Sequence, residues 1–132
     1  MHLESPTKQL NQSNETVYNF LMDISNFEKL MPENTSKFEI LNEKRFLFAL
    51  KGMPEIVLEL KEGIPHSKVV LGAASDKLPF TLIVLITETG DSQSEVQLSF
   101  EGDFNPMMSM MIKGPITKFI QTLASNMDVI GA

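Results

Sequence analysis

The sequence predicts an α+β fold in which an antiparallel sheet of about seven strands packs against one long C-terminal helix. Two observations carry this prediction. Between residues 37 and 101, apolar and polar residues alternate in short runs separated by turns rich in Gly, Pro and Asp, which is typical of antiparallel strands. After residue 105 the apolar period lengthens to that of an α-helix buried on one side.

The N-terminal segment is expected to form one strand, over residues 1–12, followed by two short helices. Ser13 and Asn14 are good N-terminal caps, and apolar residues at helical spacing follow them. A second, shorter helix is expected over residues 26–31 and is ended by Pro32, which cannot continue the helical hydrogen bonds. The apolar residues of the first helix are Val17, Phe20, Leu21 and Ile24.

Six strands are expected next, and the first of them alternates Phe38 and Ile40 with Lys37 and Glu39. Successive side chains of a strand point to opposite faces, so one face of the sheet is expected to be apolar and the other mostly wet. The inward-facing residues of the other five strands are Phe46, Phe48 and Leu50; Ile56, Leu58 and Leu60; Val69, Leu71 and Ala73; Phe80, Leu82, Val84 and Ile86; and Val96, Leu98 and Phe100.

The last segment predicts a helix from Met107 to Ile130. Asn105 is a suitable N-cap, and Pro106 takes the first helical position, where its missing N–H is not needed. A Gly-Pro pair at residues 114–115 is expected to kink the helix. The helix must bury its apolar stripe, and the apolar face of the sheet is the available partner. The stripe is formed by Met108, Met111, Ile112, Ile116, Phe119, Ile120, Leu123, Met127 and Ile130.

Length and charge limit the class of protein. The 132 residues are interpreted as one domain, residues 1–132, and carry 11 Lys and Arg against 17 Asp and Glu, a formal net charge of −6. This balance argues against binding to nucleic acid or to anionic membrane surfaces. The N-terminus has no apolar signal segment, and no apolar run approaches the roughly 20 residues that span a bilayer. We therefore expect a cytoplasmic protein without a membrane span.

Residue types limit the chemistry further. The absence of Cys excludes disulfides, thiolate nucleophiles and Cys-based zinc sites. His2 and His66 have no second ligand at metal-binding spacing, so we expect no metal site and no other cofactor. The charged residues of the strands, such as Arg45, Glu59 and Lys61, fall on the water-facing parity. Because a general acid or base must reach its substrate, an interior without ionisable residues favours binding over catalysis, and no catalytic residue is assigned.

Three segments carry a resemblance to a known family: residues 13–23 (SNETVYNFLMD), residues 26–32 (NFEKLMP) and the helix over residues 115–127. Together with the order of the elements, they resemble the START/Bet v 1-like superfamily, also called the SRPBCC or polyketide cyclase/dehydrase and lipid-transport superfamily. The resemblance covers essentially the whole chain. It implies a helix-grip fold, in which a curved sheet wraps the long helix and leaves an elongated apolar cavity. Members of the superfamily bind lipids, sterols, polyketides, quinones or plant hormones, and a few act as cyclases or aromatases.

The predicted function is therefore the binding of a small hydrophobic ligand, such as a lipid, quinone or polyketide, for transport or sequestration. Its site is expected between the sheet and the C-terminal helix, with burial of apolar ligand surface as the driving force. The residues expected to line it are Leu30, Met31, Phe48, Leu58, Leu60, Leu71, Phe80, Leu82, Val84, Phe100, Met108, Met111, Ile112 and Ile116.

Methionines are concentrated at the start of the last helix. Met side chains adapt to varied apolar shapes, so these residues are interpreted either as a deformable pocket entrance or as ordinary core filler. Met108 and Met111 follow the buried stripe, whereas Met107 and Met110 flank it.

A second surface is suggested by apolar residues on the water-facing parity of the strands. They predict a homodimer through the outer face of the sheet, although sheet curvature or another register would also account for them. These residues are Val57, Val70, Ile83 and Leu85.

Three other functions stay open at this point. A cyclase or aromatase would need polar groups that point into the cavity. A protein-interaction module similar to the Hsp90-activator relatives of the superfamily would work through the outer sheet face. A solid interior without a cavity would exclude an internal ligand altogether.

Overall fold

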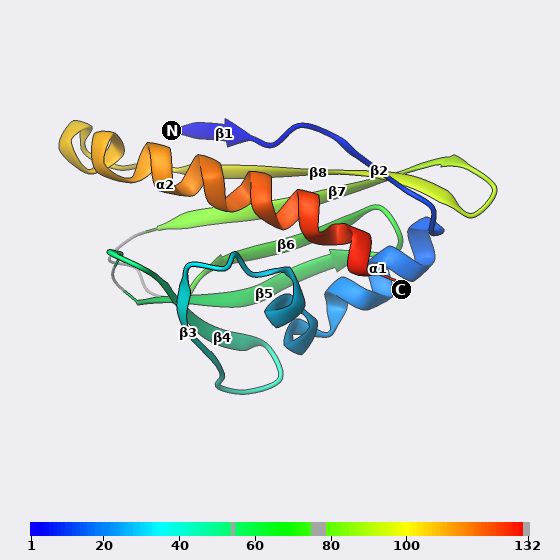
Figure 1. Ribbon diagram of the computed structural model, residues 1–132, viewed down its shortest axis with the longest axis horizontal. Helices are drawn as coiled ribbons and strands as arrows, with labels where there is room; N and C mark the ends of the chain where they lie inside the picture. The colour runs from blue at the N-terminus through cyan, green and yellow to red at the C-terminus, as the bar shows by residue number, and fades with distance from the viewer. Residues whose placement is uncertain (54, 75–78, 131–132) are drawn as a thin grey trace.

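A computed structural model of the protein describes residues 1–53, 55–74 and 79–130. Its elements confirm the predicted α+β class and the predicted order, with an antiparallel sheet and a long C-terminal helix (Figure 1). The strands are β1 (His2–Glu4), β2 (Lys8–Leu10), β3 (Thr35–Ile40), β4 (Arg45–Leu50), β5 (Ile56–Ile64), β6 (Lys68–Ala73), β7 (Phe80–Gly90) and β8 (Gln93–Gly102). The helices are α1 (Asn14–Met22), the 3₁₀ helix η1 (Ile24–Leu30), α2 (Pro106–Ser125) and the 3₁₀ helix η2 (Asn126–Val129).

The strands form one antiparallel sheet in the order β1-β8-β7-β6-β5-β4-β3, with β2 also paired to β8. The expected single N-terminal strand is thus two short strands, which makes eight strands rather than about seven. Pro6 lies between them and has no N–H to donate to a ladder. Ser5 holds the chain to β8 at this break, because its N–H donates to the carbonyl oxygen of Leu98 at 2.8 Å.

The two N-terminal helices begin at side-chain caps. The Ser13 hydroxyl oxygen accepts a hydrogen bond from the N–H of Thr16 at 3.1 Å, which confirms this residue as the N-cap of α1. Asp23 caps η1 in the same way, through the N–H of Ser25 at 3.1 Å. The second helix therefore begins two residues earlier than predicted, because Asp23 provides a cap.

Helix α2 is capped by Asn105, whose side-chain oxygen accepts from the N–H of Met108 at 2.8 Å. It continues through Pro115, where the proline cannot donate to the carbonyl group one turn earlier. At Asn126 the chain changes to the 3₁₀ helix η2, so the α-helix is shorter than predicted. The side-chain amide of Asn126 donates to the carbonyl oxygen of Leu30 at 2.9 Å and fixes this end of α2 to η1.

The sheet and α2 form the two sides of the core, and α2 crosses the strands from the end where β7 begins toward α1 (Figure 1). This is the helix-grip arrangement. Much of the core is aromatic: Phe46 stacks on Phe27 and on Phe38, each with ring centroids 5.3 Å apart. No helix in the described ranges is long and apolar enough to cross a bilayer.

Candidate functional site

The inner face of the sheet is built from apolar rows that run across the strands. Strand register places Leu60, Leu71, Leu82 and Phe100 side by side on β5, β6, β7 and β8. Neighbouring rows hold Val69, Val84 and Leu98, and Phe46 with Leu58. A continuous apolar surface therefore faces α2, as the alternation in the sequence predicts.

The second half of α2 closes tightly onto this surface. The Phe119 ring stacks on Phe48 with centroids 5.0 Å apart and planes within 6° of parallel. Ile120 and Leu123 are fully buried, and Ile116 nearly so. We call this region, around residues 116–130 of the last helical segment, the closed half. It is packed core.

The first half of α2 leaves apolar side chains partly uncovered. Phe80 stacks on Phe100 at 5.1 Å, and Phe100 stacks in turn on Phe104 at 6.2 Å, just before the helix begins. Unlike the residues of the closed half, most of these aromatic and aliphatic side chains remain in contact with solvent. We call this region the open end, and its partly buried residues are Leu60, Phe80, Phe104, Met108 and Ile112.

The predicted ligand-lining residues divide between these regions. Those that are fully or almost fully buried are Leu30, Phe48, Leu58, Leu71, Leu82, Val84, Phe100 and Ile116. Those that are partly buried are Met31, Leu60, Phe80, Met108 and Ile112.

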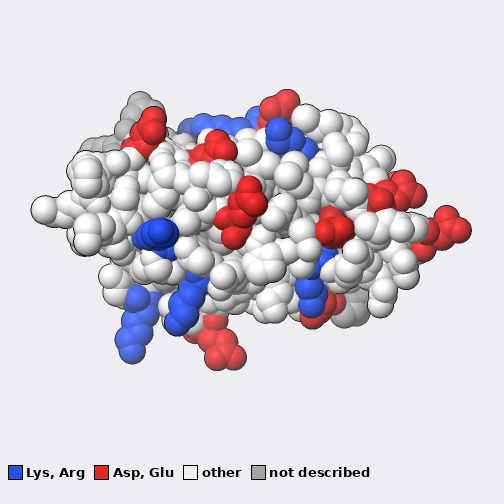
Figure 2. Space-filling view, turned by 90° about the horizontal axis from the view of Figure 1, so that it is seen from above, with Lys and Arg blue, Asp and Glu red and all other residues white. Residues whose placement is uncertain are grey.

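Met111 was predicted on the buried stripe, and this is wrong, because its side chain is 66% exposed. It lies five residues before Ile116, a separation of about 140° around the helix, so the two cannot share a face. Met111 shares the outward side of α2 with Met107 and Met110, which are 74% and 83% exposed. α2 begins at the left of Figure 1, and in Figure 2 the visible left-hand tip of the molecule shows no charged side chain.

Leu30 and Met31 lie away from the open end. The carbonyl oxygen of Leu30 meets the C-terminal end of α2 through Asn126. Met31 lines a separate hollow of about 280 Å³ beside the start of β3, together with Thr35 and Phe38. The structure therefore does not bring this pair together with Phe80 or Met108.

Phe104 belongs to the open end and was missed from the sequence. It is one of the two residues between β8 and the N-cap of α2, beyond the end of the strand and before the helix begins. The one sequence feature that could have indicated its role is an aromatic side chain between two polar residues, Asp103 and Asn105.

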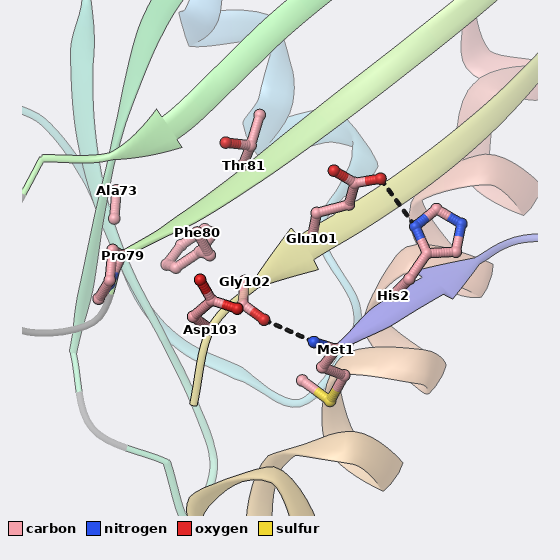
Figure 3. A pocket seen from close by; sticks show the side chains of 9 residues that line it. All are labelled: Met1, His2, Ala73, Pro79, Phe80, Thr81, Glu101, Gly102 and Asp103. Atoms are coloured by element: carbon pink, nitrogen blue, oxygen red, sulfur yellow. Dashed lines mark hydrogen bonds and ion pairs between the residues drawn. The ribbon is translucent and has the colours of Figure 1, made fainter. Parts of the chain in front are cut away.

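A larger hollow of about 540 Å³ lies at the ends of β1, β7 and β8 (Figure 3). Register puts His2, Thr81 and Glu101 on the outer face of the sheet, and Phe80 and Gly102 on the inner one. The terminal amino group of Met1 donates to the carbonyl oxygen of Gly102 at 2.7 Å. The hollow is thus a partly polar groove at the strand ends, and it shares Phe80 with the open end.

His2 lines this groove. Its ring nitrogens lie 2.7 Å from a Glu4 carboxylate oxygen and 3.0 Å from one of Glu101. The hydrogen bond with Glu4, and then that with Glu101, raises the pKa of His2 above its ordinary value of 6.5. Because all three side chains are well exposed to solvent, the effect on stability is small.

The four outer-face residues predicted for a dimer do not form one patch. Register places Val70 opposite Ile83, with Leu85 two residues further along the same face of β7. Val57 lies beside Leu47 on β4 and β5. Between these two groups runs an ion-pair chain in which Glu59 contacts both Arg45 and Lys61. Hydrogen bonds from Lys61 and Arg45 lower the pKa of Glu59.

Chemically, the side chains between the sheet and α2 offer apolar contact and little else. Besides Tyr18 at the core edge, the buried polar residues in the described part of the chain are Ser5, Ser94 and Ser99, which are not ionisable. The Ser94 hydroxyl donates to the carbonyl oxygen of Gln12 at 2.8 Å, and the Ser5 hydroxyl oxygen accepts from the N–H of Leu98 at 2.9 Å. These two hydroxyl groups are therefore engaged by the backbone.

No family model matches the sequence, and no curated protein matches it either. Solved structures do match the fold. Norcoclaurine synthase from Thalictrum flavum superposes with a TM-score of 0.75 at 10% identity, covering 97% of this chain and 91% of that one. A START superfamily protein from Mycobacterium smegmatis gives 0.68 at 12% identity, covering 96% and 94%.

A third match is a conserved protein from Geobacillus kaustophilus, with a TM-score of 0.69, 14% identity, and coverage of 97% of this chain and 93% of that chain. Likeness at such low identity shows the fold: the chain has the START/Bet v 1-like helix-grip fold that its sequence resembles. It does not transfer the activity of any one of these proteins.

Proposed function

We propose that the protein binds a small hydrophobic ligand, such as a lipid, quinone or polyketide, between the sheet and the first half of α2. One observation carries the proposal: inward-facing apolar side chains at the open end stay partly exposed, although the same layer is fully buried in the closed half. Covering such side chains with an apolar ligand removes their surface from water, worth about 25 cal/mol per Å² before the cost of ordering.

The residues of the open end suit a ligand of variable shape. Phe80 and Phe104 offer flat aromatic surfaces on either side of Phe100. Met108 and Ile112, on the sheet-facing side of α2, supply flexible and branched aliphatic contacts. Leu60 continues the surface along β5. We propose these five residues as the central contacts and the deeper predicted residues as their support.

Binding is favoured here over an enzymatic role. One structural neighbour, norcoclaurine synthase, is an enzyme by its name. A catalyst needs an acid or base within hydrogen-bond reach of its substrate. Among the described residues, the side chains that face α2 from the central rows of the sheet are apolar, so they support ligand burial rather than proton transfer.

The test is a titration of the purified protein with a fluorescent fatty acid, combined with native mass spectrometry for any ligand that copurifies. We expect saturable binding that unlabelled fatty acids, quinones or polyketides displace. Absence of both an adduct and any such binding would contradict the proposal.

Two variants on the same helix localise the site. Ile112→Lys places a charge on the sheet-facing side of α2 and is expected to weaken binding at least tenfold. Met110→Lys makes the same change on the outward side and is expected to leave binding unchanged. Equal loss in both variants would move the site elsewhere. Circular dichroism checks that both variants fold.

Self-association through the outer sheet face is a weaker candidate. The contiguous part of that face is Val70, Ile83 and Leu85, and the chain of ion pairs around Glu59 separates it from Val57. Leu85→Lys is the variant that would disrupt a dimer at this surface.

A further inference from the structure

The edge of the sheet at β3 presents unpaired backbone groups. β3 is the last strand in the sheet order, and no other described strand pairs with its outer side. The N–H of Leu41 donates to Arg45 on the β4 side at 3.0 Å. Backbone groups alternate in direction along an antiparallel ladder, so those of Ile40 and Phe38 point away from β4. Such an edge is a template for another strand.

We propose that this edge pairs antiparallel with the β3 edge of a second copy of the chain, around a two-fold axis at Phe38. In that register the outward N–H and carbonyl groups of Phe38 bond to those of Phe38 in the second copy. Lys37 then lies directly opposite Glu39 of the second copy, and the pair occurs twice because the interface is isologous. The sequence Lys-Phe-Glu at residues 37–39 is thus complementary to itself.

The charges of Lys37 and Glu39 favour the register centred on Phe38 over the registers centred on the next two residues. Pairing centred on Glu39 would place two Glu39 carboxylates opposite each other, and like charges at that position are destabilising. Pairing centred on Ile40 would leave Glu39 opposite Leu41 and would set Lys37 opposite Glu43, which lies beyond the end of β3. Only the register centred on Phe38 matches both charges.

The same register brings exposed apolar residues of one copy close to the hollow beside β3 of the other copy. Ile40 and Leu41 are 43% and 45% exposed at the end of β3. In the Phe38-centred dimer Ile40 comes level with Ser36 of the second copy, and Thr35 follows at the β-bulge that interrupts β3. Those two residues line the hollow of about 280 Å³ beside β3. Ile40 shares the inner face of β3 with Phe38, which also lines the hollow, so Ile40 of each copy lies near the hollow of the other.

Two further features of the hollow favour an occupant. The buried hydroxyl oxygen of Thr35 has no hydrogen-bond partner. Met31 and Phe38 provide its apolar wall and are themselves partly buried. A partner strand supplies both apolar contact and backbone polar groups at this position.

The internal contact of Lys37 does not oppose the pairing. Its amino group lies 3.0 Å from a Glu55 carboxylate oxygen, and both side chains are about half exposed. An exposed pair of this kind contributes little, so exchange for Glu39 of the second copy costs little. The proposed dimer contact uses β3, whereas the five proposed central ligand contacts lie on β5, on β7, before α2 and on α2 itself.

Charge reversal tests the proposal by sedimentation velocity over a series of concentrations at physiological salt. We expect the wild type to show a monomer–dimer equilibrium. Lys37→Glu alone, or Glu39→Lys alone, places like charges opposite each other twice, and each should raise the dissociation constant about tenfold or more. The double variant restores both pairs and should dimerise as the wild type does.

A mixture of the two single variants gives the sharpest readout. It sets an acidic edge against a basic edge, so we expect heterodimers where each variant alone is monomeric. Glu55→Gln is the matched control: it breaks the internal pair of Lys37 without changing the edge charges and should leave the dimer intact. Ile40→Pro removes one outward N–H at an exposed edge position and should abolish dimerisation while the fold persists.

Three results would overturn the proposal. The first is a wild type that stays monomeric at all concentrations. The second is a pair of single variants that dimerise as well as the wild type. The third is loss of the dimer in Leu85→Lys, which would assign self-association to the outer sheet face instead.

Discussion

The two halves of α2 pack on one sheet but have opposite surroundings. Around Phe119 the helix is sealed against Phe48, and the interior there is solid. Around Met108 and Ile112 the same helix leaves the sheet partly uncovered, and Met110 on its other side is almost fully exposed. The difference shows that one apolar stripe can serve two purposes, stability where it is closed and contact with a ligand where it is open.

The largest expected effect tests the closed half. Phe119→Ala should lower the free energy of unfolding by about 3–5 kcal/mol, because it leaves a cavity against the Phe48 ring that the rigid sheet cannot fill. Urea unfolding followed by circular dichroism measures the change. A loss below about 1 kcal/mol would show that this half is not packed as described.

A smaller effect is expected where α1 meets the sheet on the closed side. A methyl group at Gly63 would lie 2.5 Å from the Tyr18 hydroxyl oxygen and 2.7 Å from the sulfur of Met22. Gly63→Ala should therefore cost about 1–3 kcal/mol through overpacking. Gly72→Ala is the control, since the atoms nearest to its added methyl belong to the flexible Lys61 side chain. Equal losses in the two variants would contradict this contact.

Shortening a side chain at the open end should cost less stability than shortening one in the closed half. Ile112→Ala should cost only about 1 kcal/mol in the free protein, because this side chain is partly exposed and forms little of the packed core. A ligand at one hundred times its dissociation constant adds about 2.7 kcal/mol to the wild type, and Ile112→Ala should reduce that gain. Thermal shift with and without the fluorescent fatty acid measures both quantities. A ligand gain unchanged by the variant would place the ligand elsewhere.

The smallest effect concerns the groove at the strand ends. Because the folded-state pKa of His2 is raised, its contribution to stability is present below the ordinary value of 6.5 and disappears as the pH rises through the raised pKa. Glu4→Gln should lower the pKa of His2, and Glu101→Gln should lower it less. NMR titration of the His2 ring measures each shift. A pKa that does not respond to either change would contradict these contacts.

Much of the fold follows from sequence periodicity. Alternation in residues 37–101 predicts the strands, and the longer period after Asn105 predicts α2, because each element must turn one face to the same core. Caps at Ser13 and Asn105 fix helix starts by local hydrogen bonds, so they are readable without tertiary structure.

Local pattern also has a limit, which Met111 and Phe104 illustrate. Apolar character made Met111 a candidate for the buried stripe, but five residues of helix turn it away from Ile116. Phe104 keeps the parity of Phe100 but lies beyond the end of β8, and its stack on Phe100 depends on the path that the chain takes from β8 to α2. The sequence thus specified which side chains are apolar, whereas packing decided which of them are covered.

By itself, then, the sequence determined the class of fold, the order of its elements and an interior without ionisable groups among the predicted inward positions, because these depend on residue type and period. Tertiary structure alone decided that the helix closes at Phe119 and stays open at Ile112. It also decided that β3 ends the sheet beside a hollow. Such features depend on where elements distant in sequence meet, and local periodicity carries no information about that.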